Sequence, residues 1–299
     1  MMTDHSILLI INPRAGKMSF KNSFYSVTKL FSDAGWRVET YFTQGPGDAA
    51  QKAKKCASKF TRIIAVGGDG TLNETISGLA RHALPAKLGY LPCGSTNDFA
   101  STLGISPKPM EAAKQILADE CIDLDLGAFN DRYFTYTASF GAFTAASYNT
   151  PQNLKNAIGH FAYILSAAKQ LSDMKPIKMK VTAGDFTEEG VFLYGGVSNT
   201  TSIGGVYTLP EEDVHLGDGK MELFMVRKPQ NAAGYINTLL NVAARNYDDP
   251  NIIFMHADHV IFECDSPVPY TLDGEYGNEQ TKADIRCLEH AYTVNGKFA

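Results

Sequence analysis

Hydrophobic and polar residues in the first part of the chain follow the pattern of proteins that interleave strands with helices. Short apolar runs predict strands, and apolar residues at every third or fourth position predict amphipathic helices. Strands are expected at 7–11, 37–42, 62–66 and 87–92, and helices near 20–31, 47–60, 72–82 and 110–119. Because this alternation is typical of parallel strands with crossover helices, the pattern predicts an open, mostly parallel α/β sheet.

The pattern changes after Asp123. Most later apolar segments read as strands bounded by turns, and they predict a second, β-rich domain. Two helices are expected to interrupt it, near 153–171 and near 231–245. The apolar residues of the first of these fall at helical spacing, which favours a packed core face over a lipid-docking face. A domain boundary is therefore expected near residue 125.

Composition narrows the class of protein and of partner. Hydrophobic residues make up 44% of the 299 residues, and 27 Lys and Arg against 32 Asp and Glu give a net charge of −5. Without excess positive charge, nucleic acid is not an expected partner. The five scattered cysteines indicate reduced thiols in a cytoplasmic protein. The apolar run at 7–11 is expected to be a strand and not a signal peptide, and no stretch approaches the roughly 18 apolar residues of a membrane span.

The stretch IIAVGGDGTLNE (63–74) has the strongest chemical signature in the chain. Gly67 and Gly68 lack side chains, so a ligand can approach the backbone and successive amides can point at one anion. The helix that follows adds the positive end of its dipole. The carboxylate of Asp69 would repel phosphate unless a divalent cation came between them. The segment predicts a phosphate site, with a tight strand-to-helix turn as the alternative.

Three further segments place turns and polar groups at the ends of predicted strands. NPRAGK (12–17) and LPCGSTNDFA (91–100) follow strands of the first domain, at the edge where open α/β sheets bind ligands. YTLDGEYG (270–277) brings two carboxylates around a glycine in the second domain, although a β-turn alone explains it. Together these segments strengthen the prediction of a phosphate-binding enzyme.

The segments, taken in order, resemble the bacterial diacylglycerol kinase family of lipid kinases, which also includes sphingosine and ceramide kinases. GGDG is shared with NAD kinases and phosphofructokinases, so GSTND together with the late DGE narrows the resemblance. It implies an N-terminal α/β domain (1–125) related to those enzymes and a C-terminal β-sandwich (126–291), with 292–299 returning to the first domain. The matching segments are NPRAGK, Thr43 with Gly47-Asp48-Ala49, GGDGTLNE, LPCGSTNDFA, DLG at Asp125, GDGKMEL at Gly217 and DGE at Asp273.

The resemblance also implies a role for individual residues in an ATP- and Mg²⁺-dependent transfer to a lipid hydroxyl. Glu275 would be the general base that accepts the proton of the lipid hydroxyl as it attacks the γ-phosphate. Asp273, Asp69, Asp98 and Asp125 would organise Mg²⁺, water and the acceptor. The implied ATP contacts are Asn12, Pro13, Arg14, Ala15, Gly16, Thr43, Gly67, Gly68, Asp69, Gly70, Thr71, Leu72, Asn73 and Ser95.

A second, structural Mg²⁺ occurs in some members of this family. Its ligands here would be His215, Asp218 and Lys220. Lys220 would coordinate through its backbone carbonyl, because a protonated amine cannot bind a cation. A plain surface turn at LGDGK is the alternative.

Two departures from the family pattern keep other functions open. Ser101 stands where many relatives carry an arginine after NDFA, and NTTSIGGV from Asn199 stands where relatives are often richer in glycine. The alternatives are a NAD kinase-like enzyme with a soluble substrate and a non-catalytic nucleotide- or lipid-binding regulator.

Diacylglycerol, phosphatidylglycerol, a polyprenol and a sphingoid base all stay open as lipid acceptors presented at a membrane surface. Peripheral membrane contact with little salt dependence is expected, and a homodimer is left open.

Overall fold

The computed structural model describes residues 5–16, 19–80, 87–94, 97–141, 175–200, 202–203, 207–208 and 215–296. Contacts within the chain divide it into two compact units. Unit 1 comprises Met1–Leu124 and His290–Ala299, and unit 2 comprises Asp125–Glu289. The boundaries fall within two strands, β5 (Cys121–Phe129) and β15 (Glu275–Asn295), so the chain passes between the units in extended conformation.

The sheet of unit 1 is built from parallel strands. In spatial order they are β2 (Arg37–Phe42), β1 (Ser6–Ile11), β3 (Arg62–Gly67) and β4 (Lys87–Pro92). Every residue of β1 and β3 is buried, as expected for central strands with both faces covered. The end of β15 returns to this sheet and pairs in parallel with β4 through Val294 and Leu88.

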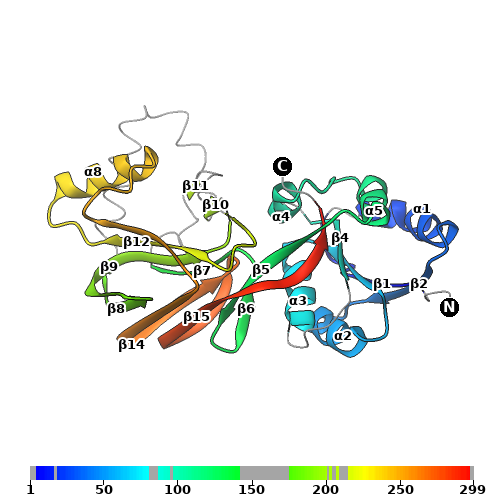
Figure 1. The fold of residues 1–299 in the computed structure, drawn as a ribbon, viewed down its shortest axis with the longest axis horizontal. Coiled ribbons are helices and arrows are strands. Elements are labelled where there is room, and N and C mark those ends of the chain that lie inside the picture. The colour runs from blue at the N-terminus through cyan, green and yellow to red at the C-terminus, as the bar shows by residue number, and fades with distance from the viewer. Residues whose placement is uncertain are drawn as a thin grey trace. The chain divides into compact units, whose positions relative to one another are not determined.

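Helices cover both faces of this sheet, with α1 and α5 on one face and α2 and α3 on the other (Figure 1). Their apolar positions recur at helical spacing, so each buries one side against the sheet. Pro109 opens α5, where its missing N–H leaves no hydrogen bond unmade. The helices of unit 1 are α1 (Ser19–Asp33), α2 (Asp48–Cys56), α3 (Asp69–Ala80), α4 (Asp98–Thr102) and α5 (Pro109–Ala118).

Unit 2 consists mainly of antiparallel strands and one described helix, α8 (Ala232–Ala243), which matches the helix expected near 231–245. The helix expected at 153–171 lies outside the described residues. The strands are β6 (Arg132–Phe134), β7 (Thr137–Gly141), β8 (Ile177–Ala183), β9 (Phe186–Ser198), β10 (Ser202–Ile203), β11 (Tyr207–Thr208), β12 (Met221–Arg227), β13 (Ile252–Ala257) and β14 (His259–Leu272).

Two long strands join most of unit 2 into one network. The first half of β9 pairs with β8 and its second half pairs with β7, and β14 divides its pairing between the same two strands. Strands that change partner along their length can pass from one packed layer to another. The expectation of a mixed α/β fold rich in sheet is confirmed, whereas the β-sandwich is not: β7, β8, β9 and β14 belong to one antiparallel network, and β10 and β11 form a separate two-stranded sheet.

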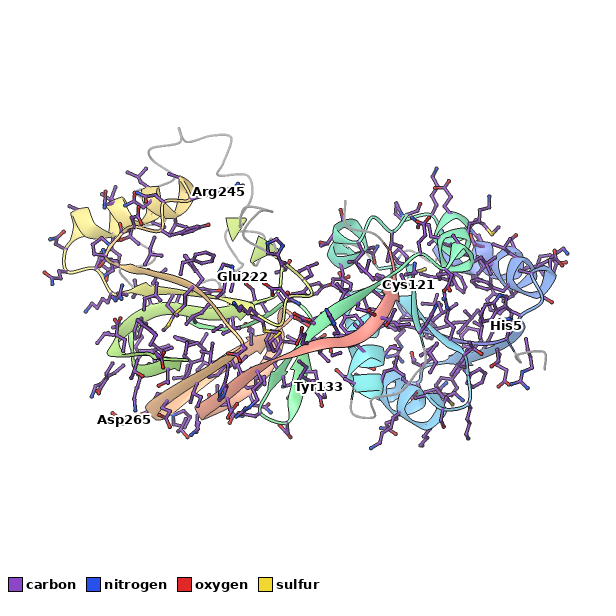
Figure 2. All side chains as sticks on the ribbon, viewed as in Figure 1. His5, Cys121, Tyr133, Glu222, Arg245 and Asp265 are labelled. Atoms are coloured by element: carbon purple, nitrogen blue, oxygen red, sulfur yellow. The ribbon has the colours of Figure 1, made fainter. Side chains whose placement is uncertain are left out.

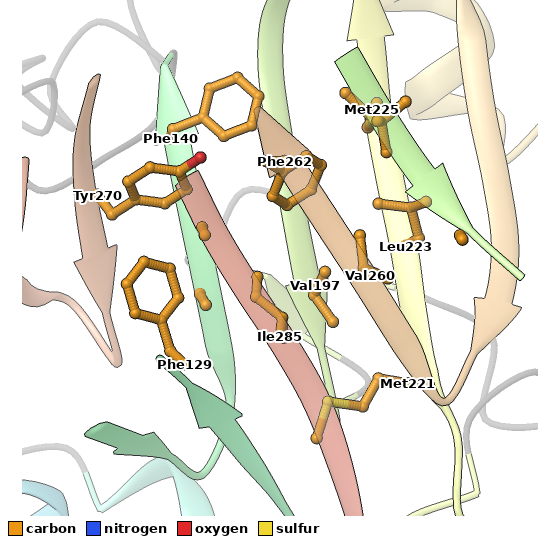
Figure 3. Packing of buried hydrophobic residues seen from close by; sticks show 14 of the residues in the cluster. Phe129, Phe140, Val197, Met221, Leu223, Met225, Val260, Phe262, Tyr270 and Ile285 are labelled. Atoms are coloured by element: carbon orange, nitrogen blue, oxygen red, sulfur yellow. The ribbon is translucent and has the colours of Figure 1, made fainter. Parts of the chain in front are cut away.

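The core of unit 2 is aromatic around the end of β14 (Figure 3). The ring of Tyr270 lies 5.0 Å from that of Phe129 and 5.5 Å from that of Phe140, centroid to centroid. Phe140 meets Phe262 edge to face at 5.4 Å. Such pairs each contribute about 0.5–1.5 kcal/mol beyond the area they bury. They fix the strand that leads directly into the DGE turn.

In the part of the chain that the structure describes, no helix has the length and apolar character needed to cross a bilayer.

Candidate active site

Two glycine turns meet at the carboxyl edge of the unit 1 sheet. Gly67 ends β3 and Gly68 leads into α3, while Gly94 follows β4. A Cβ atom on Gly68 would lie 3.2 Å from the Cα of Gly94, and a Cβ on Gly94 would lie 2.6 Å from the Cα of Gly68. The backbone N–H of Cys93 donates to the Gly67 carbonyl at 2.7 Å and extends the pairing of the two strands. A Cβ at Gly94 would therefore overlap the Gly68 backbone, and a Cβ at Gly68 would make a tight contact with Gly94.

The NPRAG turn after β1 is bonded to the same loop. The Asn12 N–H donates to the Val66 carbonyl at 2.9 Å, and its side-chain amide donates to the Thr71 hydroxyl at 3.0 Å. The Asn12 side-chain oxygen accepts the N–H of Arg14 at 2.9 Å, which closes the turn. Gly16 has a φ of +58°, and a Cβ there would overlap the carbonyl oxygen of Cys93. Turns from β1, β3 and β4 are thus tied together.

Asn97 and Tyr90 contact the turns that follow β3 and β4. Asn97 adopts a left-handed conformation with φ 53°, and its side chain accepts the Gly94 N–H at 2.8 Å and donates to the Gly94 carbonyl at 3.0 Å. Tyr90 is fully buried, and its hydroxyl lies 3.4 Å from an oxygen of Asp69 and 3.4 Å from the side-chain oxygen of Asn97. Neither role of Tyr90 has a signature in the sequence, because a tyrosine in an apolar strand reads as a core residue.

The geometry suits the phosphates of a nucleotide. The first turn of an α-helix leaves N–H groups without intrahelical partners, and α3 begins at Asp69 directly after the bare glycines. Because Gly67, Gly68 and Gly94 carry no side chains, the backbone of these turns is accessible to an anion. Asp69 brings a half-buried carboxylate to the same turn. Mg²⁺ is commonly held by one or two carboxylates together with phosphate oxygens and water, so this donor set fits Mg²⁺ bound with a nucleotide.

Other predicted contacts of this unit lie close by in the fold. Thr43 follows β2, and its N–H donates to the Ile11 carbonyl at 2.9 Å, next to the NPRAG turn. Ser95 lies outside the described residues, as does the side chain of Asp98, the first residue of α4. Pro13 and Arg14 are exposed, whereas Thr71 and Leu72 are buried and pack α3 against the sheet.

The DGE motif of unit 2 forms the turn of a hairpin. Asp273 and Gly274 both have positive φ, +50° and +83°, between the paired residues Leu272 and Glu275 of β14 and β15. Positive φ at both central positions defines a two-residue type I′ turn, which favours Asp-Gly. The turn also fixes the register, so Glu275 stands at the first position of β15.

The carboxylate of Asp273 is fully engaged by the segment before β7. Its oxygens accept the N–H groups of Thr135, Tyr136 and Thr137 at 2.8, 2.8 and 3.0 Å, and the Thr135 hydroxyl at 2.9 Å. Burial raises the pKa of Asp273, and these hydrogen bonds oppose the rise. In this geometry Asp273 holds the hairpin in place.

The side chain of Glu275, the second acid of the motif, has a different environment from that of Asp273. Its side chain is exposed and, among the described residues, has no hydrogen-bond or ion-pair partner. A carboxylate free of partners on a rigid hairpin can accept a proton from a bound hydroxyl. The two acids of the motif therefore differ in environment: the Asp273 carboxylate is bound by backbone N–H groups, and the Glu275 side chain is exposed.

Asp125 anchors the loop that contains the predicted metal ligands. It is fully buried, its N–H donates to the Leu216 carbonyl at 2.9 Å, and its Oδ2 accepts the Gly219 N–H at 2.7 Å. The Cys287 thiol lies 3.5 Å from the same oxygen, and burial raises the pKa of that thiol. Asp125 thus holds the 215–220 turn by hydrogen bonds to backbone groups of Leu216 and Gly219.

The side chains of His215, Asp218 and Lys220 are exposed, and the Lys220 N–H donates to the Asp218 carboxylate at 3.0 Å. Across the described ranges, no group of three or more His, Cys, Asp and Glu side chains is arranged to hold a metal. A site here would therefore depend on backbone carbonyls and water, as the interpretation of Lys220 already requires.

Glu222 is a buried acid that sequence reasoning missed. It lies on β12 opposite Ser198 of β9 (Figure 2), and only 1% of its surface is exposed. Burial raises the pKa of Glu222 from 4.5 to about 8. One carboxylate oxygen, Oε2, has no hydrogen-bond partner among the described residues. The signal was weak, because a single acid in the apolar run MELFMVR reads as the exposed side of a strand.

Comparison with known proteins identifies the family. Residues 6–129 match the model of the diacylglycerol kinase catalytic domain. A diacylglycerol kinase of Bacillus subtilis (strain 168) is 32% identical over 292 residues, which cover 97% of this chain and 96% of that protein. The chain belongs to the diacylglycerol kinase family.

Further relatives agree with this assignment. A diacylglycerol kinase of Staphylococcus haemolyticus (strain JCSC1435) is 33% identical over 273 residues, 91% of this chain and 82% of that protein. A crystal structure from Bacillus anthracis str. Sterne, described as that of a candidate diacylglycerol kinase, superposes with a TM-score of 0.79 at 25% identity and covers 99% of this chain and 97% of its own. The prediction of an ATP-dependent lipid kinase of the diacylglycerol kinase family is confirmed at this level.

Proposed function

We propose that the protein transfers the γ-phosphate of ATP to the hydroxyl of a diacylglycerol-like lipid. The observation that carries the proposal is the meeting of three strand-end turns at the start of α3, where the contact between Gly68 and Gly94 leaves no room for side chains. Membership of the diacylglycerol kinase family supplies the class of acceptor.

Unit 1 would bind the nucleotide. The phosphates would lie against Gly67–Asn73 and the turn at Asn12–Gly16, with Thr43 and Ser95 as further contacts. Mg²⁺ would be held by Asp69 together with phosphate oxygens, and when bound it neutralises charge that develops on the transferred group. Backbone amides and glycines orient the phosphates, because phosphoryl transfer depends mainly on positioning and electrostatics.

Unit 2 would supply the base. The Glu275 carboxylate would take the proton of the lipid hydroxyl as its oxygen bonds to the γ-phosphorus, while the bond from that phosphorus to the bridging oxygen breaks and ADP leaves with the electron pair. Asp273 would act by fixing the hairpin that carries Glu275, through its bonds to Thr135, Tyr136 and Thr137. Asp98 and Asp125 are assigned to the organisation of water and acceptor.

We extend the proposal to domains and surroundings. Residues 1–125 with 292–299 would form the nucleotide-binding domain, and residues 126–291 the second domain. The lipid would be taken from a membrane surface by peripheral contact, in the cytoplasm. A structural Mg²⁺ would be bound at His215, Asp218 and Lys220, and a homodimer is compatible with this scheme.

The test is transfer of labelled γ-phosphate from ATP with Mg²⁺ to a panel of acceptors in mixed micelles. Diacylglycerol, phosphatidylglycerol, a polyprenol and sphingosine are offered separately, with NAD as the soluble acceptor. Labelled product from one lipid and none from NAD is the expected result. Transfer to NAD alone would establish the NAD kinase-like alternative. ATP binding without transfer to any acceptor would establish the regulator, and the exposed Ser101 on α4 would then be the first position to examine.

A further inference from the structure

Helix α2 begins without a cap of its own. Its N-cap position is Gly47, in the left-handed conformation with φ 79°, and no side chain at that position bonds to the helix. The first turn of a helix has N–H groups that need acceptors, and such a terminus attracts anions. In a nucleotide-binding unit, an open helix start next to the phosphate loop would compete for phosphate.

The acceptor comes from the next helix in the sequence. Glu74, on α3, accepts the N–H of Gly47 at 2.8 Å through one carboxylate oxygen and the N–H of Ala49 at 3.2 Å through the other. These partners are separated from Glu74 by 27 and 25 residues, so the cap is a tertiary contact. A carboxylate at this position is also favoured by the helix dipole.

A second carboxylate closes the other side of the same segment. Asp48 accepts the N–H of Gln44 at 2.7 Å and the hydroxyl of Tyr41 at 2.9 Å. The two acids thus hold the segment 43–49 between the end of β2 and the first turn of α2. Helices α2 and α3 also meet backbone to backbone, because a Cβ on Gly78 would overlap the carbonyl oxygen of Ala50.

Glu74 is therefore the link between two parts of the nucleotide site. It lies one turn along the helix that starts at Asp69, and its carboxylate fixes the segment that starts at Thr43. Its carboxylate also occupies the start of α2, so the start of α3 is left as the helix N-terminus that can bind the phosphates.

We propose that Glu74 is a positioning residue for ATP, which sets the segment 43–49 against the glycine loop and excludes phosphate from the start of α2. The inference rests on the proposed function, because the contact of Thr43 with the nucleotide belongs to that proposal. Glu74 acts through the backbone and does not itself take part in phosphoryl transfer.

The experiment compares the full-length wild type with Glu74→Gln and Glu74→Ala. ATP affinity is measured by calorimetry, KM values for ATP and for the lipid by steady-state kinetics, and amide exchange of segment 43–49 by mass spectrometry. Loss of both acceptors in Glu74→Ala is expected to raise the Kd and KM for ATP about tenfold and to speed exchange of the segment. Glu74→Gln keeps one acceptor oxygen and is expected to show a smaller rise, while the lipid KM stays unchanged in both.

Glu111→Gln provides the matched control. Glu111 is an exposed acid in the first turn of α5, and its carboxylate accepts hydrogen bonds from the Ser106 hydroxyl and the Lys108 amine. Its substitution therefore removes a carboxylate from the start of a helix that lies on the opposite face of the sheet from α2. An ATP Kd that is unchanged in Glu74→Ala, or that rises equally in Glu111→Gln, would overturn the inference. Wild-type protein that shows no transfer to any acceptor would instead refute the proposed function, so the two failures are distinguishable.

Discussion

Asp273 accepts two hydrogen bonds from Thr135, one from its backbone N–H at 2.8 Å and one from its hydroxyl at 2.9 Å. This contact joins residues 138 positions apart in the chain. It ties the Asp-Gly turn to the segment that leads into β7. The hairpin that carries Glu275 is held further by the Asp273 N–H, which donates to the Thr137 carbonyl at 2.9 Å, and by Arg132, which donates to the Tyr276 carbonyl at 3.2 Å.

The first prediction concerns the stability of this hairpin. Asp273→Asn turns an NH₂ group toward backbone donors and leaves some of them unsatisfied, which typically costs about 1–3 kcal/mol. Urea unfolding should show a loss of this size. Asp265→Asn, which changes an exposed carboxylate on β14, the strand that leads into this turn, should change the unfolding free energy by less than about 0.5 kcal/mol. Equal stability of the two variants would contradict the assigned role of Asp273.

The second prediction concerns pH and Glu222. Its folded-state pKa of about 8 lies above the ordinary 4.5, so between these values the folded protein binds a proton that the unfolded chain releases. This contribution to the unfolding free energy is complete below about pH 4.5 and is lost as the pH rises to about 8. Glu222→Gln removes the titration and should flatten the decline of stability over that window. Parallel pH curves for wild type and variant would show that Glu222 does not titrate there.

The third prediction concerns the contact between the two glycine turns. Gly94→Ala would place a Cβ 2.6 Å from the Cα of Gly68 and 2.7 Å from the side-chain oxygen of Asn97, whereas Gly68→Ala would place one 3.2 Å from the Cα of Gly94. Overpacking costs about 1–3 kcal/mol, so Gly94→Ala should weaken ATP binding about tenfold or more, and Gly68→Ala should weaken it less. Calorimetric titration with ATP measures both. The reverse order would show that the turns do not approach as described.

The fourth prediction concerns the proposed structural metal. A ligand that binds only the folded state raises its thermal stability with concentration. Added Mg²⁺ should therefore raise the Tm of the wild type in the absence of nucleotide and leave that of Asp218→Asn unchanged, because the variant keeps its turn but loses a charged ligand. EDTA should reverse the wild-type shift. A wild-type Tm that is insensitive to Mg²⁺ would leave the 215–220 segment as a surface turn held by Asp125.

Local sequence patterns predicted the part of the site that lies in turns at the carboxyl ends of parallel strands. The turns after β1, β3 and β4 lie at one edge because the strands are parallel, so a reader of the sequence can expect Asn12, Gly68 and Gly94 to be neighbours. The Asp-Gly turn at 273–274 was likewise readable, because positive φ at both positions favours this pair.

The remaining relationships depend on contacts between distant segments. Nothing in the local sequence of Glu74 indicates that it caps α2. The family resemblance implies that Asp273 organises Mg²⁺, water and the acceptor, and no local pattern indicates that its oxygens accept the N–H groups of Thr135, Tyr136 and Thr137. The β-sandwich implied by the family resemblance is not confirmed, because β9 and β14 each pair with both β7 and β8.

The central claim is that Glu275 is the base of a lipid kinase, and its most direct test is the rate of γ-phosphate transfer in Glu275→Gln beside Glu279→Gln. Both residues are exposed glutamates on β15, so the pair differs in the assigned role and not in the kind of substitution. Loss of a general base should lower kcat at least about a hundredfold in Glu275→Gln with ATP affinity unchanged, while Glu279→Gln keeps wild-type rates. A Glu275→Gln variant that phosphorylates its lipid at the wild-type rate would contradict the account.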